Sequence, residues 1–291
     1  MTSGPRGQQA LGLFLLFLLP LAACGRKEGG VAPDPAGAEA MSEQEIKEME
    51  AKAMALYQQG QVAPVKRKIR IFASLIARYP RSRLVPMAYM HLIRNLFEKE
   101  VADYEEAYLR TLAFAQRVPG DPNVSECFHW VYRRGRFEGW KPERMREIEK
   151  AWMAYLDRAL DEGFAKGDAA IRHLIDKGLL LRYQAQRAGS EGRGEDERRL
   201  REAALAAYDR AFAFFPAEEK RWQLDILLQK ASVEAELGAR DAAVETFRAA
   251  ARLAGEGKST SYTPDDVGRW MQTLGLDPAV LEKDAGQRSS K

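Results

Sequence analysis

Apolar residues recur at intervals of three and four along almost the whole chain beyond its first forty residues, which is the period of amphipathic helices. The first apolar stripe runs from Ile46 to Leu56. Ser42 and Glu45 precede it with the spacing of a capping box, in which each side chain satisfies a backbone amide of the first helical turn. Gly60 follows the stripe and is suited to a helix end. The pattern therefore predicts a helix that begins after Ser42 and ends near Gly60.

A second helix is predicted from Pro64 to Tyr79, since proline is tolerated in a first turn and Pro80 cannot continue the helix. Two helices joined by a short turn form a hairpin, and the same pattern recurs along the chain. Further helices are predicted over residues 84–99, 103–118, 123–135, 142–160, 168–187, 196–215, 221–237 and 240–254. No segment shows a sustained period-2 alternation bounded by turn residues. The expected fold class is therefore all-α.

The hairpins also share an internal repeat. Ala204, Tyr208 and Ala211 are spaced by four and three residues, and the spacing returns 39 residues later at Ala243 and Phe247. This pattern resembles the second helix of the tetratricopeptide repeat. In that helix small residues let paired helices approach, and an aromatic residue fills the gap to the next hairpin.

The resemblance implies a right-handed α-solenoid of four to five such hairpins over residues 42–260. A stack of this kind needs a terminal cap over its last apolar face. Residues 261–291 are expected to supply it, beginning with a helix at Thr263-Pro264. The segment 189–197, rich in glycine and charge, is expected to be an inserted loop.

The first forty residues follow a different pattern. One basic residue, Arg6, precedes an apolar run over residues 10–20. A charged start followed by a short hydrophobic run is typical of a secretory signal, and the run is shorter than the roughly 20 residues that a bilayer-spanning helix needs. A signal-anchor helix that is never cleaved is the alternative.

Leu21-Ala22-Ala23-Cys24 closes this run and resembles the lipobox of bacterial lipoproteins. The resemblance implies that residues 1–23 are a signal peptide and that Cys24 becomes a lipidated N-terminus. Residues 24–41, dominated by Gly, Pro and Ala, would form a flexible tether. Gly25 stands where an aspartate would typically retain such a protein at the inner membrane. The expected location is therefore the periplasmic face of an outer membrane.

Charge and cysteine content narrow the possible functions. With 45 basic and 42 acidic residues the net charge is only +3, which gives no general case for nucleic acid as a partner. Cys127 is the only other cysteine, so no intramolecular disulfide is available once Cys24 is lipidated. We expect Cys127 to be a small buried apolar residue rather than a nucleophile.

No motif in the sequence indicates a reaction. His91, His129 and His173 lie on three separate predicted helices, and none has a histidine partner four residues away, so no zinc-protease motif exists. No Gly-x-Ser-x-Gly elbow or Cys-x-x-Cys pair occurs. We therefore predict no catalytic residue, no metal site and no cofactor.

Two sets of residues are candidates for binding a protein partner. In a tetratricopeptide-like stack, the first helix of each pair lines a groove. That frame selects Met87, Met90, Arg94, Phe97, Asp225 and Ser232. A second set comes from the connector between the second and third clear hairpins, an aromatic and basic segment that extends from Phe128 through Phe137 to Trp140. Its candidates are Trp130, Arg133, Arg134 and Trp140. The alternative for this second set is an aromatic core with arginines at a turn.

A lipid-anchored helical-repeat protein of this size resembles the BamD family, the scaffold lipoproteins of the β-barrel assembly machine. The resemblance rests on the segment from Arg78 to Ser82, the pair Ala88-Tyr89 and the segment from Pro122 to Val124. It implies an interaction scaffold in outer-membrane protein or envelope complex assembly. One alternative is a lipoprotein that delivers a small ligand to a transporter, which predicts a closed pocket between helices rather than an open groove. The others are a pilotin for a secretin and a peptidoglycan enzyme.

Overall fold

The computed structural model describes residues 41–214, 220–256 and 262–281, all of which belong to one compact unit that spans residues 39–291. These residues form eleven α-helices, with one further helical turn at 279–281, and they contain no strand. The helices are α1 (Glu43–Val62), α2 (Val65–Arg78), α3 (Val85–Leu96), α4 (Tyr104–Arg117), α5 (Pro122–Phe137), α6 (Pro142–Asp161), α7 (Asp168–Ser190), α8 (Gly194–Ala213), α9 (Lys220–Glu236), α10 (Arg240–Gly255) and α11 (Pro264–Thr273). The predicted all-α class is confirmed.

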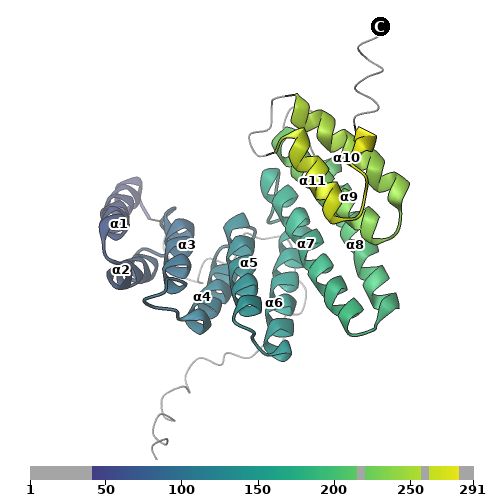
Figure 1. Ribbon diagram of the computed structural model, residues 1–291. Helices are drawn as coiled ribbons and strands as arrows, with labels where there is room; N and C mark the ends of the chain where they lie inside the picture. Colours follow the sequence, from purple (N-terminus) through teal and green to yellow (C-terminus); the bar gives the residue numbers. More distant parts are fainter. Residues whose placement is uncertain (1–40, 215–219, 257–261, 282–291) are drawn as a thin grey trace, which may run out of the picture. The chain divides into compact units, whose positions relative to one another are not determined.

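Each helix from α1 to α11 packs against its neighbours in the chain. The most extensive contacts are those of α7 with α8 and of α9 with α10. The odd-numbered helices also meet one another, α3 with α5, α5 with α7 and α7 with α9, so the first helices of successive hairpins form a common layer (Figure 1). Sequential hairpins with such a layer constitute an all-α, solenoid-like repeat fold.

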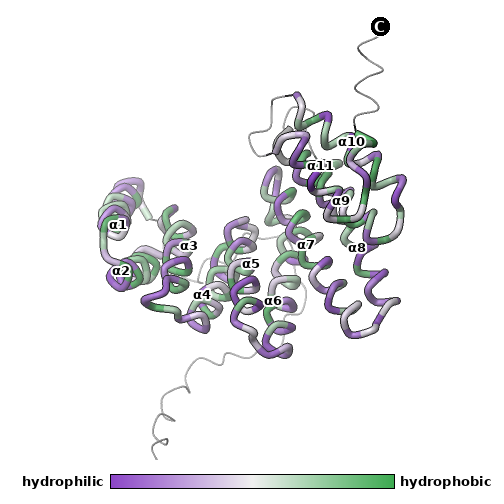
Figure 2. Tube along the Cα trace, in the orientation of Figure 1, coloured by the Kyte–Doolittle hydropathy of each residue, from purple (hydrophilic) through white to green (hydrophobic). Residues whose placement is uncertain are grey.

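The helix boundaries follow the local signals in the sequence. Ser42 and Glu45 form the predicted capping box, with the Glu45 carboxylate accepting the Ser42 backbone N–H at 2.7 Å. Thr263 and Asp266 form a second capping box at the start of α11. Hydrophilic and hydrophobic positions alternate along the helices (Figure 2), as expected for elements that bury one side.

The repeated small and aromatic residues lie in the core. Tyr208 and Phe247 are both fully buried, as are the alanines that flank them in α8 and α10. Tyr208 lies against Gly178 of the paired helix, where an added β-carbon would be 2.6 Å from the tyrosine ring. α7 and α8 thus approach closely at Tyr208, which also belongs to a buried cluster with Ile226 and Val233 of α9. Cys127 is buried as expected, and burial raises the pKa of its thiol well above the usual range.

Two expectations about connecting segments were wrong. The segment 189–197 is not an inserted loop, since α7 continues to Ser190 and α8 begins at Gly194. Only three residues separate these helices, and Arg193 in the turn forms ion pairs with Glu191 at 2.7 Å and Asp196 at 2.6 Å. The aromatic and basic segment belongs mostly to α5 rather than to a connector, because α5 continues through Phe137.

The C-terminal cap takes the place that the first helix of another hairpin would occupy. α11 packs on α10, and its Val267 and Met271 join a buried cluster with Leu228 of α9 and Phe247 of α10. The apolar face of the last hairpin is thereby covered, and the predicted capping segment is confirmed for its described part.

Candidate partner-binding surface

One side of α5 is open and carries both aromatic and basic side chains. Glu126, Trp130, Arg133 and Phe137 follow one another at intervals of four, three and four residues, which places them on one face of the helix. The other sides of α5 are in the core, where Phe128 and its neighbours are fully buried. Trp130 packs partly against that core, whereas Phe137 is 80% exposed.

Arg134 is held in place by aromatic rings. Its guanidinium lies 4.6 Å from the ring centre of Tyr104 and 5.2 Å from that of Phe137. It also donates a hydrogen bond to the Tyr104 hydroxyl and forms an ion pair with Glu138 at 2.6 Å. Cation–π contacts of this kind contribute about 0.5–1 kcal/mol each at exposed sites. Arg134 therefore supports the exposed ring of Phe137 from one side.

Phe97 and Trp140 extend this arrangement. The ring of Phe97 stacks on Tyr104 with 5.8 Å between centres, and the ring centre of Trp140 is 6.4 Å from that of Tyr104. Trp140 lies so close to Gly135 that an added β-carbon there would be 2.7 Å from the indole. Both side chains are half-buried. We call Phe97, Tyr104, Arg134, Phe137 and Trp140 the aromatic–arginine ladder.

Two arginines near the ladder have no ion-pair partner in the part of the chain that the structure describes. Arg94 in α3 and Arg133 in α5 are exposed, and their side chains make no hydrogen bond or ion pair with the described residues. The pKa of the neighbouring His129 is lowered to about 4, mainly by burial of the imidazole and further by the charge of Arg133. His129 is thus neutral at neutral pH, and the positive charge of this surface comes from the arginines.

The two methionines of α3 differ in exposure. Met87 is 41% exposed, whereas Met90 is half-buried, with its sulfur 3.5 Å from the Cys127 sulfur. Met87 therefore belongs to the open surface with Arg94, and Met90 belongs to the contact between α3 and α5.

Asp225 and Ser232 do not lie on an open surface. Ser232 is fully buried, accepts a hydrogen bond from the Trp270 indole at 3.0 Å and donates one to the Leu228 carbonyl at 2.8 Å. Asp225 is half-buried, and its charge raises the pKa of Tyr262, although burial of that phenol is the larger cause. The expected partner-binding face of α9 is thus covered by the segment that contains α11.

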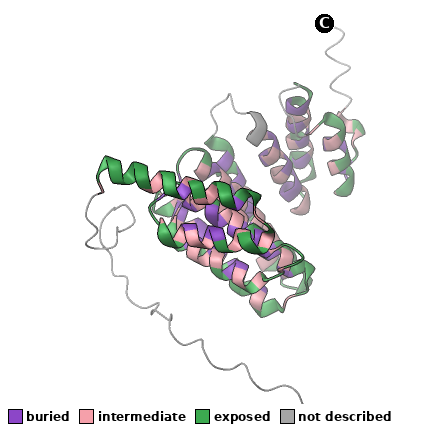
Figure 3. Cartoon of the chain, turned by 90° about the vertical axis from the view of Figure 1, so that its left-hand side faces the viewer, coloured by how far each residue is buried: buried purple, intermediate pink, exposed green. Residues whose placement is uncertain are grey.

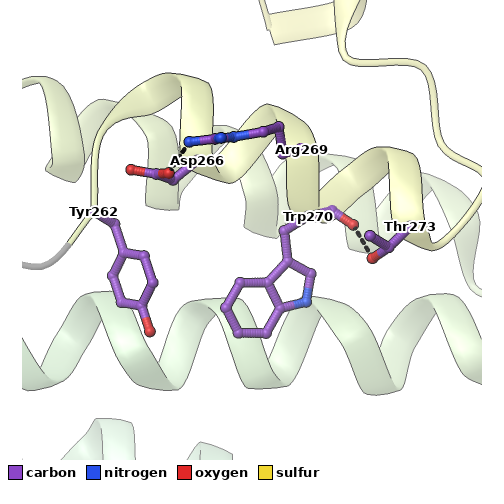
Figure 4. A pocket seen from close by; sticks show the side chains of 5 residues that line it. All are labelled: Tyr262, Asp266, Arg269, Trp270 and Thr273. Atoms are coloured by element: carbon purple, nitrogen blue, oxygen red, sulfur yellow. Dashed lines mark hydrogen bonds and ion pairs between the residues drawn. The ribbon is translucent and has the colours of Figure 1, made fainter.

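A depression of about 390 Å³ lies at this cap and is lined by Tyr262, Asp266, Arg269, Trp270 and Thr273. Figure 4 shows the rings of Tyr262 and Trp270 side by side below the ion pair of Asp266 with Arg269. The depression is open to solvent rather than enclosed between helices. It does not resemble the closed chamber that the small-ligand alternative predicts.

The histidines serve the packing of the hairpins. His91 pairs through Nε2 with Tyr57 and Gln61, both at 2.9 Å. His173 is fully buried between the Ala169 carbonyl at 2.7 Å and the Tyr155 hydroxyl at 3.0 Å. Within the described ranges, no group of three His, Cys, Asp or Glu side chains is placed to hold a metal ion.

Sequence reasoning included Phe137 in the aromatic segment but did not select it as a binding residue, and it did not select Tyr104. The spacing of Phe137 from Trp130 and Arg133 would have indicated the shared face. The contact of Tyr104 with Arg134 joins residues 30 positions apart, and no local pattern signals it.

No protein-family model matches the chain, and no curated protein matches it. Among the described residues, no helix is long and apolar enough to cross a membrane. The predicted signal peptide over residues 1–23, Cys24 and the predicted tether as far as residue 40 lie outside the described residues.

Proposed function

We propose that this chain is a non-catalytic scaffold lipoprotein that binds protein partners in the periplasm. Lipid on Cys24 would hold it at the periplasmic face of the outer membrane, and its work would be the assembly of outer-membrane proteins or envelope complexes. The observation that carries the proposal is the aromatic–arginine ladder with exposed Phe137, next to the unpartnered Arg94 and Arg133.

This combination has the character of a binding hot spot. Aromatic and arginine side chains dominate the energetics of protein interfaces, because they bury much area and form directed polar contacts. Phe137 does not stand alone, because Arg134 joins it to Tyr104, and the rings of Phe97 and Trp140 lie next to Tyr104. Apolar groups that gather on a surface mark interaction sites, whereas a single exposed ring does not. The acidic residues of α5 and its C-terminal end do not pair with Arg94 or Arg133, because Glu138 forms an ion pair with Arg134 and Glu126 forms one with Arg172. A carboxylate of a partner could therefore reach Arg94 and Arg133.

The chemistry of the surface favours one kind of partner segment. Apolar side chains of the partner would cover Phe137 and Met87, and carboxylates would pair with Arg94 and Arg133. We therefore expect an apolar and acidic segment of an envelope protein, and not a nucleic acid.

The test is site-specific photo-crosslinking in intact cells, with the crosslinking residue placed at Met87. Recovery of a defined envelope-assembly subunit is expected, and Phe137→Ala together with Arg133→Ala should reduce its yield at least tenfold, since hot-spot truncations cost about 2 kcal/mol or more. Phe212→Ala is the matched control, because Phe212 is another exposed phenylalanine, in α8. Equal yields from the two variants would contradict the proposed surface. Recovery of secretin subunits would favour the pilotin alternative.

The anchor has a separate test. Cys24→Ala should prevent lipidation, so the mature lipid-modified species should vanish from mass spectra and from the outer-membrane fraction. An unchanged outer-membrane fraction would defeat the lipoprotein part of the proposal, whatever the crosslinking shows.

A further inference from the structure

The first hairpin carries a local excess of positive charge that the balanced composition of the whole chain hides. Between positions 64 and 83 there are seven basic residues and no acidic one. They are Lys66, Arg67, Lys68, Arg70, Arg78, Arg81 and Arg83. Five of these lie in α2, which has no carboxylate of its own to offset them.

The fold of α2 gathers part of this charge on one side. Ile71, Phe72 and Leu75 are buried and fix the inward face of the helix. The outward side is exposed and contains four cations, Lys66, Arg67, Arg70 and Arg78, together with Ala77. Figure 3 looks onto the end of the unit that contains this hairpin and shows how much of its outer surface is exposed. We call these four cations the basic face of α2.

No described residue neutralises the basic face. None of its four side chains makes a hydrogen bond or ion pair with the described residues. α8 carries several arginines as well, but these are neutralised: Arg198, Arg199 and Arg201 each form an ion pair with an acidic residue at 3.0 Å or less. Unpaired cations on one side of a helix attract an anionic surface, and the attraction weakens as salt is added.

We infer that the basic face of α2 binds the anionic phospholipid surface of the membrane that holds the chain, an inference that rests on the proposed lipid anchor. The tether predicted from the sequence of residues 24–41 would have a mean span of roughly 20–25 Å, which would keep the first hairpin within reach of the headgroups. Small side chains at Ser74 and Ala77 lie between the cations and leave them free to meet a flat surface. The contact would orient the hairpin against the bilayer, whereas the anchor alone would leave it free to rotate.

The partner is a lipid surface rather than an acidic protein because the face combines charge with few apolar side chains. Its exposed residues offer no large ring or aliphatic side chain to serve as an interface anchor, in contrast to Phe137 on α5. A lipid phosphate group can be bound by an accessible positive charge without an apolar anchor. Each basic residue near an anionic membrane strengthens binding about fivefold.

The experiment uses the purified full-length lipoprotein with a fluorophore at Ala77→Cys, since Cys24 is blocked by lipid and Cys127 is buried. The protein is added to vesicles of phosphatidylcholine alone or mixed with phosphatidylglycerol, both containing a quencher at the lipid headgroup. We expect quenching at position 77 only with phosphatidylglycerol, and its loss in 1 M salt, where the screening length falls to about 3 Å. A fluorophore at Ala206→Cys, an exposed position in α8, should show no such dependence.

The decisive variant is Lys66→Gln with Arg67→Gln and Arg70→Gln, which should weaken phosphatidylglycerol-dependent binding on the order of a hundredfold. The control removes three charges elsewhere, through Arg210→Gln, Arg240→Gln and Arg252→Gln, which are all exposed and form no ion pair with a described residue. Equal quenching in both vesicle types, or unchanged quenching in the first variant, would overturn the inference and leave the anchor standing. If mass spectrometry finds no lipid, the anchor fails instead, and co-sedimentation with phosphatidylglycerol vesicles still decides whether the basic face binds them.

Discussion

Close contacts between single residues hold the hairpins together. Gly178 in α7 and Tyr208 in α8 are the clearest example, because the fully buried tyrosine ring fills the space where a side chain at position 178 would lie. Arg187 and the buried Glu149 form another such contact, an ion pair between α7 and α6. Glycine at position 178 is therefore explained by the lack of space for a larger side chain beside Tyr208.

Gly178→Ala should therefore destabilise the fold. The new β-carbon would lie 2.6 Å from a ring that has no space to move, and overpacking of this kind costs about 1–3 kcal/mol. Thermal unfolding monitored by circular dichroism should show a midpoint several degrees lower.

Gly194→Ala is the matched control, since nothing lies within 4 Å of a β-carbon at position 194 and its backbone is not left-handed. That variant should keep or slightly raise the midpoint. A lower midpoint in both variants would show that general helix effects, and not the Tyr208 contact, decide the outcome.

At the scale of single helices, α11 differs from the others because it caps the stack instead of forming a hairpin. It covers the face of α9 and α10 that a further hairpin would cover in a longer stack, and Trp270 fixes it to Ser232. The same segment covers Asp225 and Ser232, which the repeat pattern had placed in a binding groove. The element that completes the fold thus decides which parts of the odd-helix layer stay open.

Truncation after Glu256 should expose the buried cluster that contains Leu228 and Phe247. We expect increased binding of a hydrophobic dye and a lower unfolding midpoint, because an uncovered terminal repeat loses its neighbour interface. Truncation after Leu281 removes only the tail beyond α11 and should behave like the full chain. Dye binding that is equal in the two truncations would contradict the capping role of α11.

For the whole described unit, the core is divided. One buried cluster extends from α2 to α7, a second joins α7, α8 and α9, and a third joins α9, α10 and α11. Stability in such a stack is a sum of local contributions from each hairpin and its interfaces, rather than the property of one central core. Damage at one end is therefore not transmitted evenly to the other.

Phe247→Ala tests this division. The ring is fully buried, and its loss should cost about 3–5 kcal/mol locally. Hydrogen exchange should accelerate strongly in peptides from α9 to α11 and little in peptides from α3 to α5. Leu75→Ala in α2 should give the converse pattern. Uniform acceleration over all helices in either variant would indicate a single cooperative core instead.

Local patterns predicted the helices well. The Ser42–Glu45 capping box, the prolines and the apolar stripes each act within one or two turns, so the sequence contains all the information that they need. Prediction was less successful around Gly189, where α7 continues to Ser190 although glycine and charge suggested a loop. There Glu197 of α8 packs against Gly189 and pairs with Arg201, and contacts between two helices outweigh the local propensity.

The candidate site was predictable only in part. Arg133 and Arg94 were selected and are exposed, whereas Ser232 was selected and is buried beneath Trp270, 38 residues away in the chain. Phe137 was not selected, although it is the most exposed ring near the site. Exposure depends on which other segment covers a helix face, and the spacing of residues within one helix does not contain that information.

The sequence by itself determined the all-α hairpin repeat and the positions of most helix ends, because helix period and capping are local interactions. Tertiary structure alone decided that α11 covers the outer face of α9, that Tyr104 and Arg134 support Phe137, and that the cations of α2 remain without partners. These features depend on contacts between residues 30 or more positions apart, or on the absence of such contacts among the described residues, and only the packed chain settles them.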